Sequence, residues 1–214
     1  VWGTAPALGV RAVTEYTFMV FLSPVGPYFK GGVRPLNLKV ETDYHRAAPR
    51  GIGNAKAIGN YSASLYPLTM AKKEGFDEVI YLDSNNENQI EELGSANLFI
   101  VKDGIVKTPK LSGSILDGVT RDSVCKIASE LLKLKVFETN VTINELIEAD
   151  EVFCTGTAVV VTPVGKVTYN NQVHEINKNQ LGPIAGKCKE LLSAIQRQEI
   201  DDPFGWVTPV IKGS

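Results

Sequence analysis

The 214-residue sequence contains little histidine and little cysteine. Its two histidines, His45 and His174, are isolated from each other and from any pair of cysteines at ligand spacing. We therefore expect no metal site. The three cysteines, Cys125, Cys154 and Cys188, are odd in number, far apart and embedded in apolar segments. This pattern indicates reduced thiols of a hydrophobic core and disfavours a disulfide framework.

The sequence also lacks an excess of charge and any long apolar run. Lys and Arg number 22 against 24 Asp and Glu, which gives a formal net charge of -2. Basic surfaces recognise nucleic acid and acidic membranes, so neither partner is expected. No apolar run approaches the roughly 20 residues that span a bilayer, and no signal-peptide pattern opens the chain. A small, weakly charged ligand fits better; the cytoplasm is the default compartment, with mitochondrial or plastid targeting left open.

Length and composition favour one large globular domain, or one domain with a piece of another. A hydrophobic content of 43% over 214 residues is enough for a sizeable core. Residues 24–35 hold three prolines and three glycines and are the best candidate for a linker. Residue 1 is Val and the chain opens without a cap or leader, so we expect that further sequence precedes it.

Hydrophobic periodicity predicts a mixture of strands and helices. Strands are expected at residues 15–22, 36–42, 78–83, 97–101, 136–141, 151–154 and 158–162, with a hairpin over 166–173 around Asn170 and Asn171. Helices are expected at 61–75, 121–134, 143–149 and 181–198, and a polar turn at 84–89. This mixture, with several hairpin connections, predicts an α/β or α+β fold with a mixed sheet. The order of the strands does not follow from these patterns.

A glycine-rich loop around Lys56 is the most unusual local feature. In RGIGNAKAIGNYS, residues 50–62, three glycines flank one lysine just before a predicted helix. Glycine lets the backbone turn tightly and approach a ligand closely. A lysine in such a loop is nevertheless more often a solvated surface residue, so the loop alone does not assign a function.

Three polar clusters stand at the ends of predicted elements, at residues 91–95, 118–121 and 155–158. The second cluster opens a predicted helix, where free backbone N–H groups favour an anion such as phosphate. A surface carboxylate, ordinary helix capping and a turn are the alternative interpretations of the three clusters. Their combination with Lys56 favours function, because a lysine, a carboxylate and phosphate donors are what an enzyme needs to hold pyridoxal phosphate.

Four motifs follow one another along the chain: KAIGNY at residues 56–61, EELGSANLF at 91–99, LDGVTR at 116–121 and FCTGTA at 153–158. In order and spacing they resemble the class IV aminotransferases and, within that family, the branched-chain amino acid aminotransferases. The segment TFMV at 17–20, which runs into SPVGPYF at 23–29, adds to the likeness. The resemblance implies the family's α/β fold, a large C-terminal domain with a mixed sheet and surrounding helices.

The resemblance implies that the cofactor is pyridoxal 5'-phosphate and that Lys56 binds it covalently. Lys56 would also carry the proton between the substrate's α-carbon and the cofactor, which requires a deprotonated amine that burial would favour. Glu92 would face the pyridine nitrogen and keep it protonated. Tyr61 would form a hydrogen bond with the phenolic oxygen of the ring.

The same resemblance implies contacts to the cofactor's phosphate and to the substrate. The phosphate contacts, through backbone N–H and hydroxyl groups, are implied for Val119, Thr120 and Thr157. Substrate-pocket positions are implied for Ser95 and Ala158, and for Val10, which would be lent to the neighbouring subunit of a homodimer.

One departure from the family concerns the small N-terminal domain, nearly all of which is absent from this sequence. Family members use that domain to supply an arginine to the phosphate and aromatic and arginine groups to the substrate. We therefore interpret residues 1–29 as a remnant of the small domain, 30–36 as an interdomain linker and 37–214 as the large cofactor-binding domain.

The leading functional hypothesis is a transaminase that interconverts leucine, isoleucine or valine with their 2-oxo acids, with 2-oxoglutarate and glutamate as the other pair. Another class IV enzyme, a D-amino acid aminotransferase or an aminodeoxychorismate lyase, shares the lysine and glutamate motifs and is the nearest alternative. A third hypothesis is an inactive fragment that retains only the cofactor-binding half. The motifs do not give the preferred amino acid.

Overall fold

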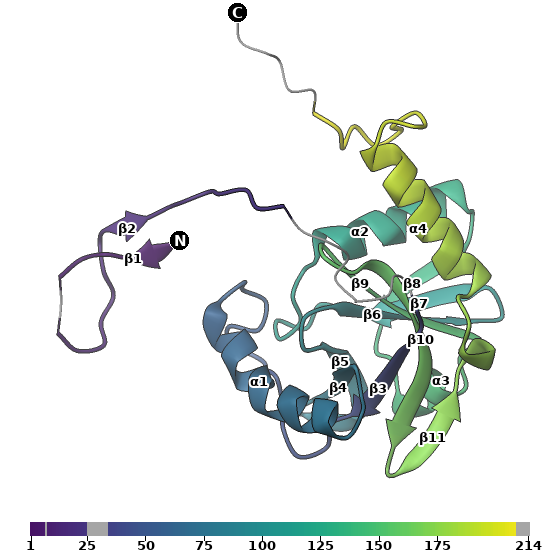
Figure 1. Cartoon of the computed structure of the whole chain (residues 1–214), viewed down its shortest axis with the longest axis horizontal. Helices are drawn as coiled ribbons and strands as arrows, with labels where there is room; N and C mark the ends of the chain where they lie inside the picture. Colours follow the sequence, from purple (N-terminus) through teal and green to yellow (C-terminus); the bar gives the residue numbers. More distant parts are fainter. Residues whose placement is uncertain (7, 25–33, 209–214) are drawn as a thin grey trace, which may run out of the picture.

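The computed structural model describes residues 1–6, 8–24 and 34–208, and in this part of the chain a mixed sheet with helices against it forms the body (Figure 1). The strands of the sheet are β3 (Leu36–Val40), β4 (Glu78–Asp83), β5 (Asn86–Leu93), β6 (Asn97–Lys102), β7 (Ile105–Pro109), β8 (Lys135–Thr139), β9 (Glu151–Gly156), β10 (Val160–Tyr169) and β11 (Gln172–Glu175). The helices are α1 (Ile58–Lys73), α2 (Val119–Lys126), which a π-helical turn continues over Ile127–Leu131, α3 (Ile143–Ile147) and α4 (Pro183–Gln196). A short 3-10 turn spans Asn177–Asn179.

The sheet runs in the order β5-β4-β3-β10-β9-β6-β7-β8, and β11 pairs with β10. Strand β3 is parallel to β4 and to β10, and β7 is parallel to β8, whereas the other neighbours in the sheet are antiparallel. The expected mixed sheet is therefore confirmed. No helix in the described part of the chain has both the length and the apolar character needed to cross a bilayer.

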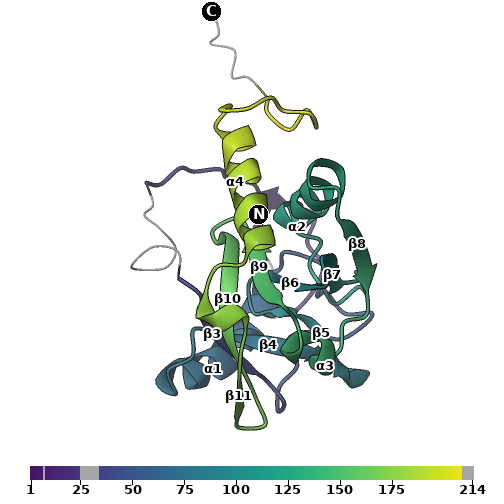
Figure 2. The ribbon, with the colours of Figure 1, turned by 90° about the vertical axis from the view of Figure 1, so that its right-hand side faces the viewer.

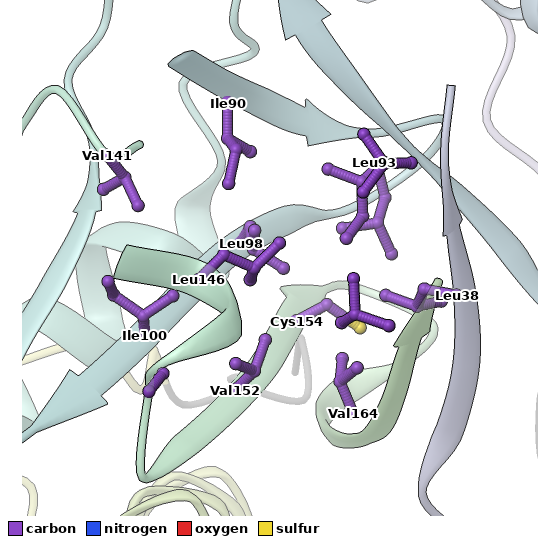
Figure 3. Close-up of a cluster of buried hydrophobic side chains, with 14 of the residues drawn as sticks. Leu38, Ile90, Leu93, Leu98, Ile100, Val141, Leu146, Val152, Cys154 and Val164 are labelled. Atoms are coloured by element: carbon purple, nitrogen blue, oxygen red, sulfur yellow. The ribbon is translucent and has the colours of Figure 1, made fainter. Parts of the chain in front are cut away.

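Strand β6 shows how the sheet buries both of its faces. Leu98 and Ile100 join the cluster that includes Leu146 of α3, and these side chains converge in Figure 3. Phe99 and Val101 join the opposite cluster, which includes residues of α2 and α4. Because successive side chains alternate across a strand, an unbroken apolar run is what a strand covered on both faces requires.

The pairing of β6 with β9 places two distant turns at one edge of the sheet. Asn97, at the start of β6, lies opposite Thr155, near the end of β9. The turn that precedes β6 and the turn that follows β9 therefore lie side by side. The segments before α1 and α2 reach the same region, so four loops far apart in the sequence meet there.

Two expectations about the strands were wrong. Residues 84–89 were expected to form a turn, but β5 begins at Asn86, and its first half is exposed and polar. Residues 15–22 were expected to form a buried strand, but only Tyr16–Thr17 (β2) pairs, with Trp2–Gly3 (β1), and Phe18 to Leu22 are exposed. A run with strand propensity forms a ladder only where a neighbouring strand offers partners. Figure 1 shows β1 and β2 to the left of the body, and in Figure 2 they lie behind it. Residues 25–33 of the expected linker lie outside the described residues.

Candidate functional site

The four loops enclose a cavity of about 420 Å³ at this edge of the sheet. The sequence-predicted residues that line it are Lys56, Tyr61, Glu92, Ser95, Val119, Thr120, Thr157 and Ala158. They come from segments as far apart in the sequence as Lys56 and Ala158, so the fold and not local sequence brings them together. Val10 does not line this cavity; it is fully exposed on the N-terminal segment.

Glu92 is a buried polar side chain of the cavity that three contacts hold in place. It lies next to the end of β5, is 3% exposed, and accepts hydrogen bonds from Asn97 Nδ2 at 3.0 Å and from the Leu116 amide at 2.9 Å. Its Oε1 also forms an ion pair with Arg46. Burial raises the pKa of Glu92 to about 7, and it outweighs the lowering by Arg46 and by the Leu116 amide. The carboxyl is thus held in place and holds a proton through part of the neutral pH range.

Arg46 is a member of the site that the sequence did not reveal. Its buried guanidinium contacts Glu92 and donates hydrogen bonds to the carbonyl oxygens of Gly53, at 3.2 Å, and Ser114. It therefore joins the carboxylate to the loop that carries Lys56. Nothing in the segment distinguishes Arg46 from the exposed Arg50 four positions later. In a helix or a strand, the spacing of apolar residues would indicate which of the two arginines is buried. Residues 46–50 form neither, so their sequence gives no such indication.

The loop before α1 is fixed by short-range contacts that leave Lys56 free. Asn60 Nδ2 donates to the carbonyl oxygens of Ile52 at 2.7 Å and Ala55 at 2.9 Å, which closes the loop on itself. Lys56 Nζ lies 4.7 Å from the centre of the Tyr61 ring, where the ring face attracts a cation. The sequence-based role for Lys56 invoked burial, but its side chain is exposed in this chain.

The N-terminus of α2 offers backbone N–H groups to the cavity. Gly118 is the N-cap and provides no side-chain cap, so the first amides of the helix have no internal partner. A Cβ at Gly118 would lie 2.2 Å from Asn97 Oδ1, so the close approach of this loop to β6 requires glycine. Val119 is 82% exposed, and Thr157 faces the same cavity from the turn after β9. Such a helix terminus binds anions, phosphate among them.

Thr155 is a second cavity residue that sequence analysis passed over, although it lies within the motif FCTGTA. Its side chain is fully buried, and among the described residues its hydroxyl has no hydrogen-bond partner. A buried hydroxyl without a partner costs free energy unless a ligand or water satisfies it. Together with the amine of Lys56, the carboxyl of Glu92 and the α2 amides, it makes a cavity suited to a ligand with several polar ends.

Comparison with known proteins assigns the chain to a family. The family model described as amino-transferase class IV matches residues 1–167. A branched-chain amino acid aminotransferase 5, chloroplastic, of Arabidopsis thaliana is 47% identical over 204 residues, which are 95% of this chain and 49% of that relative. The chain thus spans about half the length of such curated relatives.

Solved structures agree with the sequence relatives. The branched-chain amino acid aminotransferase of Escherichia coli has a TM-score of 0.77 and 34% identity, and the match covers 86% of this chain and 59% of that one. The Thermobaculum terrenum enzyme of the same name, solved in its PLP form, has a TM-score of 0.70 and 27% identity, and the match covers 77% of this chain and 52% of that one. The resemblance found in the four motifs is confirmed: the chain belongs to the class IV aminotransferases.

Proposed function

We propose that the chain binds pyridoxal 5'-phosphate and transfers the amino group of leucine, isoleucine or valine to 2-oxoglutarate. The observation that carries the proposal is the arrangement of Lys56, Glu92 and the N-terminus of α2 around one cavity. The amine of Lys56 matches the aldehyde of that cofactor, and the carboxyl of Glu92 matches its ring nitrogen. The free amides at the N-terminus of α2, the proposed anion-binding site, match its phosphate. The names of the relatives support the choice of branched-chain amino acids.

Unsatisfied polar groups in the cavity support the fit to this cofactor. The Thr155 hydroxyl has no partner among the described residues, and the first amides of α2 have no side-chain cap. A polar ligand that reaches both would remove the cost of leaving them unpaired. When bound, pyridoxal phosphate supplies an aldehyde carbon that reacts with amines and a protonated ring that accepts electrons from the substrate's α-carbon.

The side chains of the chain itself would bind, orient and move protons. Lys56 would hold the aldehyde carbon and, once displaced by the substrate amine, act as the base that takes the proton from the α-carbon. Glu92, fixed by Arg46 and by the contacts around it, would face the ring nitrogen and keep that nitrogen protonated. Tyr61 would bind the phenolic oxygen of the ring. The phosphate would be held by Val119, Thr120 and Thr157.

The substrate pocket and the partner are further parts of the proposal. Ser95 and Ala158 line the cavity with small side chains, which leaves room for a branched substrate side chain. Val10 would complete the pocket of a second copy of the chain, and its full exposure on the N-terminal segment is compatible with that role. We assign residues 1–29 to a small domain, 30–36 to a linker and 37–214 to the large domain.

The test combines cofactor binding with amino transfer. The purified chain is mixed with pyridoxal phosphate, and the visible absorbance of lysine-bound cofactor is followed, then leucine and 2-oxoglutarate are added and glutamate is measured. Lys56→Ala should abolish the absorbance and the glutamate, whereas Lys73→Ala, on the exposed end of α1, should leave both unchanged. An absorbance that persists in Lys56→Ala would overturn the assignment of Lys56.

Other outcomes of the same test separate the alternatives. Cofactor binding without glutamate would mean that the chain is only the cofactor-binding half of the enzyme. Transfer from D-alanine without transfer from leucine would indicate another class IV activity.

A further inference from the structure

Glu91 and Glu92 are neighbours in β5, and both are almost completely buried, at 1% and 3% exposure. Only Glu92 lines the proposed cofactor cavity. Glu91 lines a separate hollow of about 140 Å³ between β5 and the segment around residues 109–115. The two carboxyls lie between Ile90 and Leu93, where the pairing of β5 with β4 shifts register, and each lines a different hollow, so they are not alternatives for one role.

The two carboxyls nevertheless contact the same loop, residues 112–116. Ser114 Oγ donates a hydrogen bond to Glu91 Oε1, and the Leu116 amide donates to Glu92 Oε1 at 2.9 Å. Ser112 Oγ and Ser114 Oγ lie 2.7 Å apart, so the hydroxyls continue the contact along the loop. Residues 112–116 are thus attached to β5 at two points, Ser114 at Glu91 and Leu116 at Glu92.

This loop leads directly into the N-terminus of α2, the proposed anion-binding site. Two residues after Leu116 comes Gly118, the N-cap of α2, whose first amides face the cavity. A shift of residues 112–116 would move these amides relative to Lys56 and Glu92. Arg46 alone does not fix the loop, because it reaches only the Ser114 carbonyl oxygen.

Burying Glu91 costs the fold free energy, so stability alone does not explain its contact with Ser114. Within the described residues its Oε2 has no hydrogen-bond partner, and burial raises the pKa of Glu91. An apolar residue would fill the same space without that cost.

We propose that Glu91 is a positioning residue for the phosphate of the cofactor: through Ser114 it holds residues 112–116 so that the first amides of α2 meet the phosphate. This inference rests on the proposed function, and it adds a residue that does not touch the cofactor. It predicts a defect confined to the phosphate end of the ligand.

Binding of pyridoxal phosphate is compared with binding of pyridoxal, which lacks the phosphate, by titration of the purified chain. Glu91→Ala should weaken pyridoxal phosphate by about fivefold or more, the effect of losing one buried hydrogen bond, and leave pyridoxal within about twofold. Glu91→Gln, which keeps an oxygen for Ser114, should restore most of the lost affinity. Glu87→Ala makes the same change on the exposed part of β5 and should have no effect.

A double-mutant cycle tests the contact itself. Ser114→Ala keeps the carbonyl oxygen that Arg46 uses and removes only the hydroxyl, so it should reproduce the loss of phosphate preference. In Glu91→Ala/Ser114→Ala the losses should not add, because both changes break one contact. Additive losses, or equal weakening of both ligands in Glu91→Ala, would overturn the inference. If the unmodified chain does not bind pyridoxal phosphate through Lys56, the proposed function fails instead, so the two failures are distinguishable.

Discussion

Arg46 Nη2 lies 2.5 Å from Glu92 Oε1, and both side chains are excluded from solvent. Because Arg46 also donates to the Gly53 carbonyl oxygen, this pair connects the end of β5 to the loop that carries Lys56. The distance between the proposed reactive amine and the proposed ring-nitrogen partner is therefore set by a buried ion pair and not by the chain between them.

Loss of Arg46 should be among the most damaging single substitutions in the site. At pH 8, where the Glu92 carboxyl of the unsubstituted chain is ionised, Arg46→Leu leaves that carboxyl buried without its counter-charge, and breaking a buried pair in this way costs about 3–5 kcal/mol of unfolding free energy. Denaturation in urea measures the change. Arg34→Leu is the matched control, because its pair with Asp77 is exposed on the arginine side and should be worth less than about 1 kcal/mol. Equal losses in the two variants would contradict the buried-pair interpretation.

Glu92 should make the stability of the cofactor-free chain depend on pH. Burial raises its pKa from 4.5 to about 7, so between these values the folded chain binds a proton that the unfolded chain does not. Its contribution is fully present below about pH 4.5 and is lost as pH rises through about 7. Relative to Glu92→Gln, the unfolding free energy of the unsubstituted chain should fall by about 3 kcal/mol over this range. A difference that is constant or rises with pH would refute the assignment.

The glycines of the Lys56 loop should respond differently to alanine. A Cβ at Gly53 would lie 2.2 Å from the Ser114 carbonyl oxygen and 2.6 Å from Ala47 Cβ, so Gly53→Ala must displace the loop and should cost about 1–3 kcal/mol. A Cβ at Gly59 meets no atom within 4 Å, and alanine in a helix should add up to about 1 kcal/mol. Thermal unfolding of the two variants should shift in opposite directions. A shift of the same sign in both would contradict the packing around Gly53.

Much of the sheet could be predicted because its turns and apolar runs are formed by residues that are close together in the sequence. The hairpin around Asn170 and Asn171 is present, and both residues have positive φ, as tight two-residue turns between strands require. The apolar runs of β6 and β9 are buried on both faces, as their composition indicates. These features depend on residues close in sequence, so they could be found without the fold.

The parts that escaped prediction depend on distant partners. The polar start of β5 forms a strand because β4 pairs with it, not because of its own propensity. Val160 adopts a φ of 53°, which is unusual for a β-branched residue, directly after the turn that carries Thr157. The role of Arg46 depends on Glu92, which lies almost fifty positions away. The motifs named the cavity residues, but only the fold shows what holds them.

The proposed anion-binding site at the N-terminus of α2 can be tested by removing a single backbone N–H. Val119 is the first residue of α2, a position where proline is well tolerated because its amide is not needed by the helix. Gly118 before it has φ -79° and ψ 129°, the extended conformation that a following proline favours. Val119 is also 82% exposed, so a proline ring has space. Val119→Pro should therefore fold with nearly unchanged thermal stability.

The same variant should bind pyridoxal phosphate about tenfold or more weakly, because it loses one hydrogen bond to a charged group, while pyridoxal binding stays within about twofold. Val119→Ala trims the side chain and keeps the amide, so comparing the two variants separates the N–H from the side chain. A loss of the same size in both variants would mean that the side chain, not the amide, contacts the ligand. Unchanged pyridoxal phosphate binding in a folded Val119→Pro would show that the Val119 amide does not bind the phosphate, because this variant lacks that N–H and Val119→Ala accounts for the side chain.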